Sequence, residues 1–427
     1  MKVLITTLGS TGDLNPVMGI GLELKKQGHY VGIATSLYFK TEIEKQGLAF
    51  HEVFPNLEPG LEDLKKFVTD PIKGSELLHR HYIFPGLEKS YETVLGILDD
   101  YDMILSATLT YFTPIACRIK NKPWITVCLS PMLFFSAYDP PVLAPLPQLR
   151  HFYFSPSVNK FLFNLLFRMS SSWLEPYHRL WKKVGLEGTP NPFLKDGFSP
   201  YGTVALFSPI FGKPQPDWSN NVFTAGFSFY DKNSNSTRND DLTSFLAENP
   251  SPVLFTLGTT AVMNPGKMYD EFIEAQNRLG FPCIILTGKE NYGVYKKYHK
   301  GNVFIADFIS YSVVMPDCSL IVHQGGSGTT AQAMRSGNPM IILPHCNDQY
   351  DNAQRAENLG VSKTLPYKSL SAYKLGNLID QVLKSTEMKT SAIELGRKIR
   401  TEKAEQNAVK FIEQVFSDQK VKKQVQP

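Results

Sequence analysis

The sequence predicts an α/β protein built from two doubly wound parallel sheets. Short apolar runs alternate with longer helical stretches, these runs form two sets of five, and a polar segment separates the two sets. At 427 residues the chain also exceeds the size of one ordinary hydrophobic core, so we expect more than one domain.

The ten apolar runs are the expected strands. Runs that are apolar on both faces are typical of buried parallel strands, and the segments between them are long enough for crossover helices. The first half contains VLITTL, YVGIATS, MILSAT, WITVCLS and TVALFS, and the second contains VLFTLG, CIILTG, VFIAD, LIVHQ and MIILP.

The polar segment FYDKNSNSTRNDDLTSF, residues 229–245, is rich in Asn, Asp and Ser, and we expect the hinge between the domains near Asp231 to Asp240. The expected domains are residues 1–230 and 241–405. A helix with a polar tail is expected over residues 406–427.

Two aromatic-rich stretches, residues 55–100 and 131–195, are too long to be plain crossovers. Any single aromatic side chain there is most simply explained by packing on a sheet, whereas the group as a whole favours an apolar ligand cleft. The basic and aromatic segment Arg179 to Lys183 gives a weaker indication of contact with a membrane surface.

Composition narrows the classes of function. A net charge of +4 without a dense basic block before the last few residues argues against nucleic-acid binding. Five scattered cysteines form no CxxC pair, and three of them, Cys128, Cys283 and Cys318, lie in or beside apolar runs, where reduced core thiols are expected. No leader-like segment precedes the first strand, so we expect a cytoplasmic protein. No apolar run approaches the roughly 18 residues of a membrane span. No DxD, HExxH or Cys/His set suggests a metal site.

The stretch HQGGSGTT, His323 to Thr330, joins an expected strand to an expected helix. Glycine permits a sharp turn there, and the first turn of a helix presents unpaired N–H groups that bind phosphates. A tight structural turn is the alternative. Similar junctions occur at LFTLGTT, with Gly258, Thr259 and Thr260, and at Gly9 to Pro16, and all three would face one crevice if the sheets oppose each other.

Two other phosphate-binding motifs are excluded. The phosphate loop of nucleotide triphosphatases requires GxxxxGK[ST], and no lysine follows here. A dinucleotide fingerprint requires GxGxxG with a later acidic residue, and LGSTGDLNP followed by YVGIATS lacks both features.

Two long stretches of the sequence resemble a known family. LITTLGSTGDLNPVMGIGLELKKQGHYVGIATS resembles the amino-terminal signature of family 1 glycosyltransferases, in the branch of sterol and antibiotic glucosyltransferases, and IVHQGGSGTTAQAMRSGNPMIILPHCNDQYDNAQRAENLGV resembles their donor-binding signature. The resemblance implies the GT-B fold, in which two Rossmann-like domains face each other. It also implies that the last helix, here AEQNAVKFIEQVF, crosses back onto the first domain.

The resemblance also assigns the donor site. Phe308 stands where many relatives have a tryptophan that stacks on the nucleobase, and Asp348 and Gln349 match the pair that binds sugar hydroxyls. The phosphate-touching histidine of the plant motif aligns with Gln324, which leaves direct contact of His323 open. The full set of donor positions is Gly12, Gly258, Thr259, Phe308, Ile309, His323, Gln324, Gly325, Gly326, Ser327, Gly328, Thr329, Asp348 and Gln349.

Asp13 is the expected general base, because antibiotic glucosyltransferases have an aspartate at the matching position. Its alternative role is that of a turn residue at the start of a helix. A histidine–aspartate dyad is not expected, since Ser106 and Thr108 stand in place of the supporting carboxylate. His79 and His81 are candidate partners of Asp13, with solvated or core histidines as the alternative.

We therefore expect an enzyme that transfers a hexose, with inversion, to a hydroxyl of a hydrophobic small molecule. UDP-glucose is the preferred donor. Neither a metal nor another cofactor is expected, and the chain should be a monomer or weak dimer with at most transient membrane contact. The expected acceptor contacts are Ser10, Thr11, Phe84, Phe134 and Phe135. The alternatives are a sugar-nucleotide epimerase or hydrolase of the same fold and a non-catalytic nucleotide-sugar-binding protein.

Overall fold

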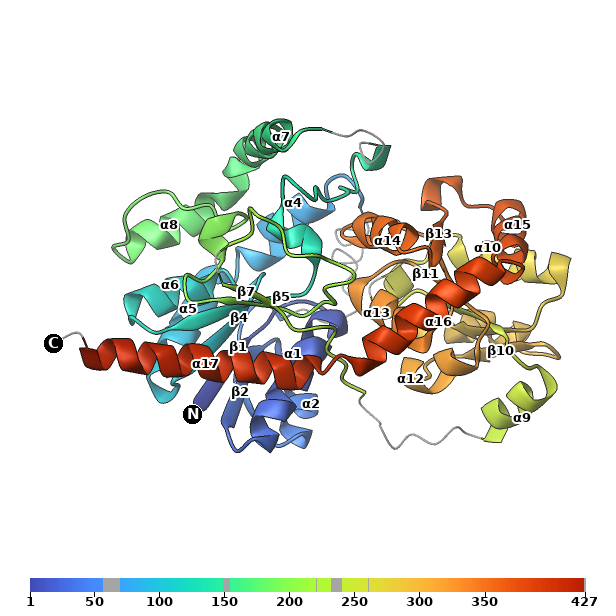
Figure 1. Cartoon of the computed structure of the whole chain (residues 1–427), viewed down its shortest axis with the longest axis horizontal. Helices are drawn as coiled ribbons and strands as arrows, with labels where there is room; N and C mark the ends of the chain where they lie inside the picture. The colour runs from blue at the N-terminus through green and yellow to red at the C-terminus, as the bar shows by residue number, and fades with distance from the viewer. Residues whose placement is uncertain (57–69, 149–153, 220, 232–239, 260, 426–427) are drawn as a thin grey trace.

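Two parallel sheets, one in each half of the chain, form the framework of the protein (Figure 1). The structure is a computed structural model. It describes residues 1–56, 70–148, 154–219, 221–231, 240–259 and 261–425.

The sheet of the N-terminal lobe has the order β3-β2-β1-β4-β5-β6-β7. Its strands are β1 Lys2–Thr6, β2 Tyr30–Thr35, β3 Ala49–Glu52, β4 Met103–Ala107, β5 Trp124–Cys128, β6 Thr203–Ala205 and β7 Val222–Thr224. The strand order reverses between β1 and β4, and ligands of such sheets bind at the carboxyl ends of the strands beside this reversal. The Asp13 loop follows β1 at this point.

The sheet of the C-terminal lobe has the order β10-β9-β8-β11-β12-β13. Its strands are β8 Val253–Thr256, β9 Cys283–Leu286, β10 Val303–Ala306, β11 Leu320–His323, β12 Met340–Ile342 and β13 Ser362–Thr364. Its reversal lies between β8 and β11, which pair in register with His323 opposite Thr256. The glycine junctions after these two strands are therefore neighbours.

Helices cover both faces of each sheet (Figure 1). In the N-terminal lobe they are α1 Thr11–Lys26, α2 Lys40–Lys45, α4 Gly74–Leu78, α5 Leu87–Ile97, α6 Phe112–Ile119, α7 Pro156–Met169 and α8 Glu175–Lys183. The remaining ones are α9 Asp240–Glu248, α10 Met268–Leu279, α11 Gly288–Tyr295, α12 Tyr311–Val314, α13 Ser327–Ser336, α14 Gln349–Asn358, α15 Ala372–Leu383, α16 Thr386–Thr401 and α17 Ala404–Val425.

The last helix, α17, lies on the N-terminal lobe, as Figure 1 shows. Val409 and Ile412 of α17 are buried in the same hydrophobic cluster as Leu14 and Val17 of α1. A second cluster extends from the N-terminal lobe into the C-terminal lobe. The predicted return of the chain onto the first domain is confirmed.

All ten predicted strands are present, and the predicted fold class is confirmed. The sequence interpretation missed β3, β7 and β13, which are short edge strands. An edge strand has one neighbour and more contact with water, so β3 and β13 lack the continuous apolar run of a buried strand. Most of the expected hinge, residues 232–239, lies outside the described residues.

The five cysteines are all free and buried, in agreement with the prediction of reduced core thiols. None of the helices in the described ranges combines the length and the apolar character that a membrane crossing requires.

Candidate functional site

The turn between β11 and α13 depends on glycine. Gly325 has φ +95°, and a Cβ on it would lie 2.7 Å from Cγ2 of Ile342 and 3.1 Å from the carbonyl oxygen of Gln349. Gly326 is the N-cap of α13, and no side chain caps this helix. The first turn therefore offers N–H groups at the positive end of the helix dipole, which suits an anion.

Gln324 and His323 have different surroundings in this turn. The amide Nε2 of Gln324 lies between the two glycine junctions, 2.4 Å from where a Cβ would stand on Gly258 and 2.8 Å from where one would stand on Gly326. Its Oε1 is buried without a hydrogen-bond partner in the described part of the chain. Gln324 is thus well placed for a polar ligand group.

His323 is completely buried. The Gly325 N–H donates to its Nδ1 at 3.0 Å, its Nε2 lies 3.4 Å from Sδ of Met340, and burial lowers its pKa to about 3. The ring is therefore neutral and holds the turn from the inside. Of the two candidates for the diphosphate, Gln324 has the more suitable position.

Tyr311, the first residue of α12, is a member of the site that the sequence interpretation missed. Its hydroxyl lies 2.9 Å from Oγ1 of Thr256, and it also interacts with the Thr329 side chain and the Gly258 backbone. Burial raises the pKa of Tyr311, so its hydroxyl stays protonated. It links the loop after β8 to α13. Tyr311 lies three residues after Phe308 in the sequence, and no local sequence pattern indicates its contacts.

Asp348 and Gln349 lie at the start of α14, beside the glycine turn. Oδ2 of Asp348 accepts hydrogen bonds from Ser327 Oγ at 2.7 Å and from Asn352 Nδ2 at 2.9 Å. Asn352 also donates to the Gly325 carbonyl at 2.9 Å, which ties α14 to the turn. Burial raises the pKa of Asp348, although the bonds from Ser327 and Asn352 oppose this shift.

Gln349 accepts hydrogen bonds at Oε1 from the N–H groups of His345 and Cys346, at 2.8 and 3.1 Å. Its Nε2 has no partner among the residues that the structure describes. This amide and the second oxygen of Asp348 are therefore available to a ligand.

Asp13 is the third residue of α1 and forms a capping box with Ser10. The Ser10 N–H and Oγ donate to Oδ2 of Asp13 at 2.7 and 3.1 Å, and no hydrogen bond within the described residues reaches Oδ1. Gly9 has φ +128°, and a Cβ on it would lie 2.2 Å from Oδ2. Asp13 therefore does cap the start of α1 through Oδ2, and its Oδ1 remains free for another partner.

The electrostatics of Asp13 connect the two lobes. Burial and, to a smaller extent, the negative charge of Asp348 raise its pKa to about 6 against the hydrogen bonds from Ser10. The expected base and the expected sugar-binding pair therefore lie within electrostatic range of each other. A pKa near 6 suits a group that accepts a proton close to neutral pH.

The acceptor-side aromatics are mostly packed against one another. Phe134 is stacked on Phe198 at 5.0 Å and on Trp218 at 4.1 Å between ring centroids. Phe135, in the left-handed region at φ 44°, meets Phe163 and Phe167 of α7 edge to face.

The other expected site positions are partly exposed and partly buried in the core. Phe84 is buried in the core of the N-terminal lobe, whereas Phe308 is 65% exposed and Ile309 is half-buried. Ser10, Thr11 and Gly12 form the start of α1, and Thr259 is exposed after β8. Thr260 lies outside the described residues.

His79 is a core histidine. Its Nδ1 lies 2.6 Å from the Ser75 carbonyl, its Nε2 lies 2.9 Å from the Tyr111 hydroxyl, and burial lowers its pKa to about 4. Ser106, at the end of β4, bonds to Thr110 at 2.9 Å, and Thr110 bonds to Thr6 at 3.0 Å. In this region other family branches have the carboxylate that supports a catalytic histidine, and here it contains a chain of hydroxyl groups.

An ion-pair network, in which Arg355 and Asp351 are buried and Asp139 is partly exposed, joins the lobes beside the site. Arg355 of α14 donates to Asp351 of α14 and to Asp139 of the N-terminal lobe, both at 2.7 Å. Asp351 also accepts the N–H of Val142 at 3.0 Å. We call Arg355, Asp351 and Asp139 the clasp. It connects the helix that begins at Gln349 to the loop that carries Phe134 and Phe135.

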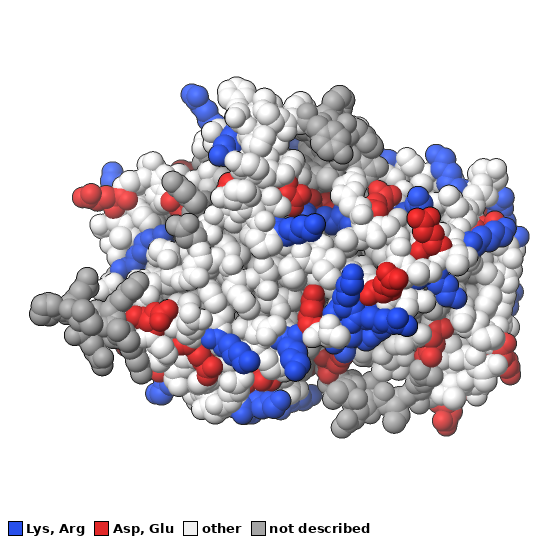
Figure 2. All heavy atoms as spheres, viewed as in Figure 1, with Lys and Arg blue, Asp and Glu red and all other residues white. Residues whose placement is uncertain are grey.

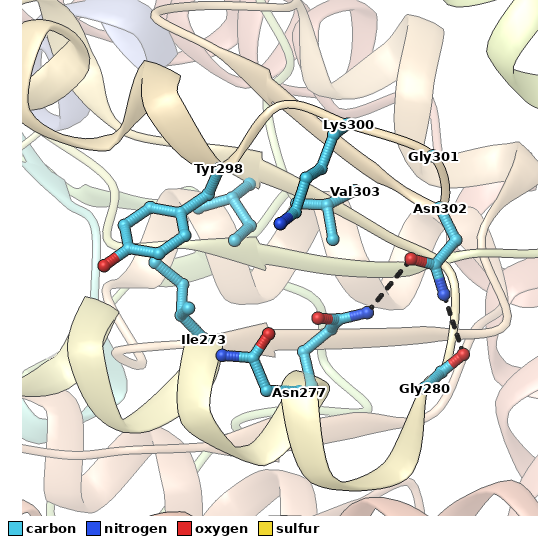
Figure 3. A pocket seen from close by; sticks show the side chains of 10 residues that line it. Ile273, Asn277, Gly280, Tyr298, Lys300, Gly301, Asn302 and Val303 are labelled. Carbon is cyan, nitrogen blue, oxygen red and sulfur yellow. Dashed lines mark hydrogen bonds between the residues drawn. The ribbon is translucent and has the colours of Figure 1, made fainter.

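A cavity of about 430 Å³ lies far from these groups, at the amino ends of β9 and β10 (Figure 3). Gln276 and Asn302 meet across it at 3.3 Å, and Asn302 donates to the Gly280 carbonyl at 2.8 Å. It opens at the opposite edge of the sheet from the glycine turn and takes no part in the site. Within the described ranges, His, Cys, Asp and Glu form no group of three or more suited to a metal ion.

Two family models match the chain. Residues 3–97 match the N-terminal domain of glycosyltransferase family 28, and residues 283–415 match the C-terminal domain described as erythromycin biosynthesis protein CIII-like.

Curated relatives align along nearly all of the chain. The O-mycaminosyltylonolide 6-deoxyallosyltransferase of Streptomyces fradiae is 25% identical over 97% of this chain and 97% of its own length. The sterol 3-beta-glucosyltransferase of Eremothecium gossypii is 24% identical over 95% of this chain, and the chain spans 33% of the length of that relative.

Solved structures agree on the fold. The glycosyltransferase of kitacinnamycin has a TM-score of 0.73 at 17% identity, with 97% of this chain and 99% of that chain covered. VinC, solved in complex with dTDP, has a TM-score of 0.66 at 19% identity, with 98% and 100% covered. With both lobes matched by glycosyltransferase models and the fold shared along nearly the whole chain, the protein has the GT-B fold of the glycosyltransferases and is similar in sequence to sterol glucosyltransferases and antibiotic glycosyltransferases.

Proposed function

We propose that this protein transfers a sugar from a nucleotide diphosphate sugar to a hydroxyl group of a hydrophobic small molecule. The observation that carries the proposal is the position of Asp13 within electrostatic range of Asp348, which in turn accepts a hydrogen bond from Ser327 in the uncapped first turn of α13. A base, a pair of sugar-binding groups and an anion site thus meet where the two lobes join.

The proposed reaction is a single displacement with inversion. The free Oδ1 of Asp13 accepts the proton of the acceptor hydroxyl while the hydroxyl oxygen attacks the anomeric carbon of the sugar. The bond from this carbon to the diphosphate oxygen breaks, and the leaving diphosphate takes the electron pair. N–H groups of α13 and the amide of Gln324 stabilise the negative charge that develops there.

The donor of this proposal is UDP-glucose. Uracil would stack on exposed Phe308, and the glucose hydroxyls would bond to Asp348 and Gln349. Thymidine diphosphate sugars form the second donor class to test, because VinC was solved with dTDP. Metal independence is part of the proposal, and activity that survives EDTA would support it.

A mass-spectrometric screen tests this function directly. UDP- and dTDP-sugars are offered with a mixture of hydrophobic alcohols, and glycoside mass and nucleoside diphosphate release are measured together. The proposal expects both signals to depend on the acceptor. Donor conversion without an acceptor would favour the epimerase or hydrolase alternative, and tight donor binding without turnover would favour a binding protein.

A further inference from the structure

Helix α7, Pro156–Met169, has an apolar face that the rest of the described chain leaves uncovered. Phe161 is 67% exposed, Met169 is 73% exposed and Leu165 is 47% exposed. Val158 and Leu166 are exposed as well. Residues 158, 161, 165 and 169 follow helical spacing and form one stripe. Most of the exposed large apolar side chains in this protein are scattered singly, so this stripe is unusual.

The charges of α7 have one sign. The helix contains Lys160 and Arg168, both exposed, and no acidic residue. Helical spacing places Lys160 and Arg168 along one side of the stripe. Figure 2 shows basic side chains beside uncoloured surface at the upper edge of the view, where Figure 1 places α7.

The basic segment of α8, which the sequence suggested for membrane contact, is a weaker candidate. Arg179 bonds to Glu175 and Lys183 bonds to Glu88, so acidic partners neutralise these two cations. Lys160 and Arg168 of α7 have no ion-pair partner in the described part of the chain.

The inner face of α7 is firmly attached to the protein. Asn159 is buried and donates to the carbonyl of Ala137 at 2.8 Å. Phe163 and Phe167 pack on Phe135. The helix is therefore a fixed part of the N-terminal lobe, and its apolar stripe points away from it.

We propose that α7 docks the protein on the surface of an anionic lipid bilayer. The helix would lie in the plane of the interface, with Phe161, Leu165 and Met169 among the upper acyl chains and with Lys160 and Arg168 at the anionic headgroups. This inference goes beyond the proposed function, and it places the Phe135 loop directly behind the helix that contacts the bilayer.

A second copy of the chain is a less suitable occupant. In an antiparallel pair centred on the stripe, Lys160 of one helix would lie opposite Arg168 of the other, and in a parallel pair like residues would meet. Both arrangements bring four cations to an interface to which α7 contributes no acidic residue. An anionic surface satisfies the apolar stripe and the charges at once.

Vesicle flotation of the full chain tests the proposal, with neutral phosphatidylcholine vesicles compared with vesicles that also contain phosphatidylglycerol. Wild type should bind the anionic vesicles in a salt-sensitive manner. Phe161→Glu should reduce the bound fraction roughly tenfold or more, and the double variant Lys160→Glu and Arg168→Glu should do the same on anionic vesicles. Val294→Glu, at an exposed position of α11, is the matched control and should bind like wild type.

A Phe161→Trp variant adds a second readout, because its fluorescence should shift to the blue on anionic vesicles if the side chain enters the bilayer. Equal binding by wild type and Phe161→Glu, or no binding by wild type, would overturn the proposal. Self-association that Phe161→Glu abolishes, with no vesicle binding, would identify a second copy as the occupant and also overturn it. Because neither donor nor acceptor is present, the result is independent of the transfer assay.

Discussion

The C-terminal lobe builds its side of the site around glycine turns with a few polar side chains, whereas the N-terminal lobe builds most of its side from aromatic side chains. The turn at Gly325 and the loop at Gly258 have positive φ and no room for a Cβ. On the other side, Phe134 is fixed by stacking on Phe198 and Trp218. A backbone requirement can be met by one residue type only, while an aromatic cluster can be built in many ways. The donor side should therefore respond to the change of a single atom more strongly than the acceptor side.

Asp13 belongs to the N-terminal lobe but depends on a glycine turn, and its substitution should have the largest effect. Asp13→Asn should reduce kcat by about 10²–10⁴-fold, the usual contribution of a general base. In wild type the rate should rise with pH through about 6 and then level off, because burial raises the pKa of Asp13 to that value and only the ionised carboxylate accepts a proton. Initial rates from pH 5 to 8 measure this limb.

Ser10→Ala is the matching control for Asp13. It removes the Oγ donor at 3.1 Å that lowers the pKa of Asp13, so the rising limb should move to higher pH while the plateau rate changes little. Full activity of Asp13→Asn would eliminate Asp13 as the base and leave it only its capping role.

The next effect concerns the Gly258 loop. In Gly258→Ala the new Cβ would stand 2.4 Å from Nε2 of Gln324 at φ +62°, so the amide must leave its place between the two glycine junctions. We expect the donor KM to rise about 10- to 100-fold, equivalent to roughly 1.4–3 kcal/mol, because the donor would no longer receive a polar interaction from this buried amide. Steady-state kinetics with a saturating acceptor measures it.

Gly280→Ala provides a control with the same backbone strain. Gly280 has φ +69°, but a Cβ on it would meet no atom within 4 Å. This variant should lose about 1 kcal/mol of unfolding free energy and keep the wild-type donor KM. If both variants raise the donor KM equally, the effect comes from strain and not from Gln324.

The same contrast explains how much the sequence could predict. The glycine turn was identifiable because strand ends and glycine spacing determine where it lies, whereas Asp348 and Asp13 were assigned through the family resemblance. Tyr311 was missed because its contacts with Thr256 and Thr329 depend on how a short helix packs, which leaves no local pattern. The clasp was missed because Arg355 and Asp139 are 216 residues apart. Long-range contacts between side chains of common types give no signal in one sequence.

A substitution in the clasp tests whether the donor side and the acceptor side act independently. Asp139→Asn removes the charge that the N-terminal lobe contributes to Arg355, while Arg355 keeps its bond to Asp351. We expect the acceptor KM to rise roughly three- to tenfold, with the donor KM unchanged, because the Phe134–Phe135 loop loses one of its ties to α14. Kinetics with each substrate varied in turn separates the two constants.

Asp231→Asn is the matched control for the clasp. Asp231 pairs with Arg335 of α13 at 3.2 Å, which also joins residues from the two halves of the chain but does not touch the aromatic loop. It should leave both constants near wild type. An equal rise in acceptor KM in both variants would mean that any loosening of the lobes is sufficient and that the clasp has no specific role.

The smallest effect is expected at Phe308, an exposed aromatic side chain assigned to the donor side. It is 65% exposed after β10, so its replacement should leave the unfolding free energy nearly unchanged. If a nucleobase stacks on its ring, Phe308→Ala should weaken nucleoside diphosphate binding about two- to tenfold, and Phe308→Trp should tighten it slightly through the larger ring. Titration calorimetry with UDP and dTDP measures both variants. Because stacking tolerates different bases, we expect the two nucleotides to lose similar affinity in Phe308→Ala. Unchanged binding would mean that the base lies elsewhere and that the donor side relies on its glycine turns and polar side chains.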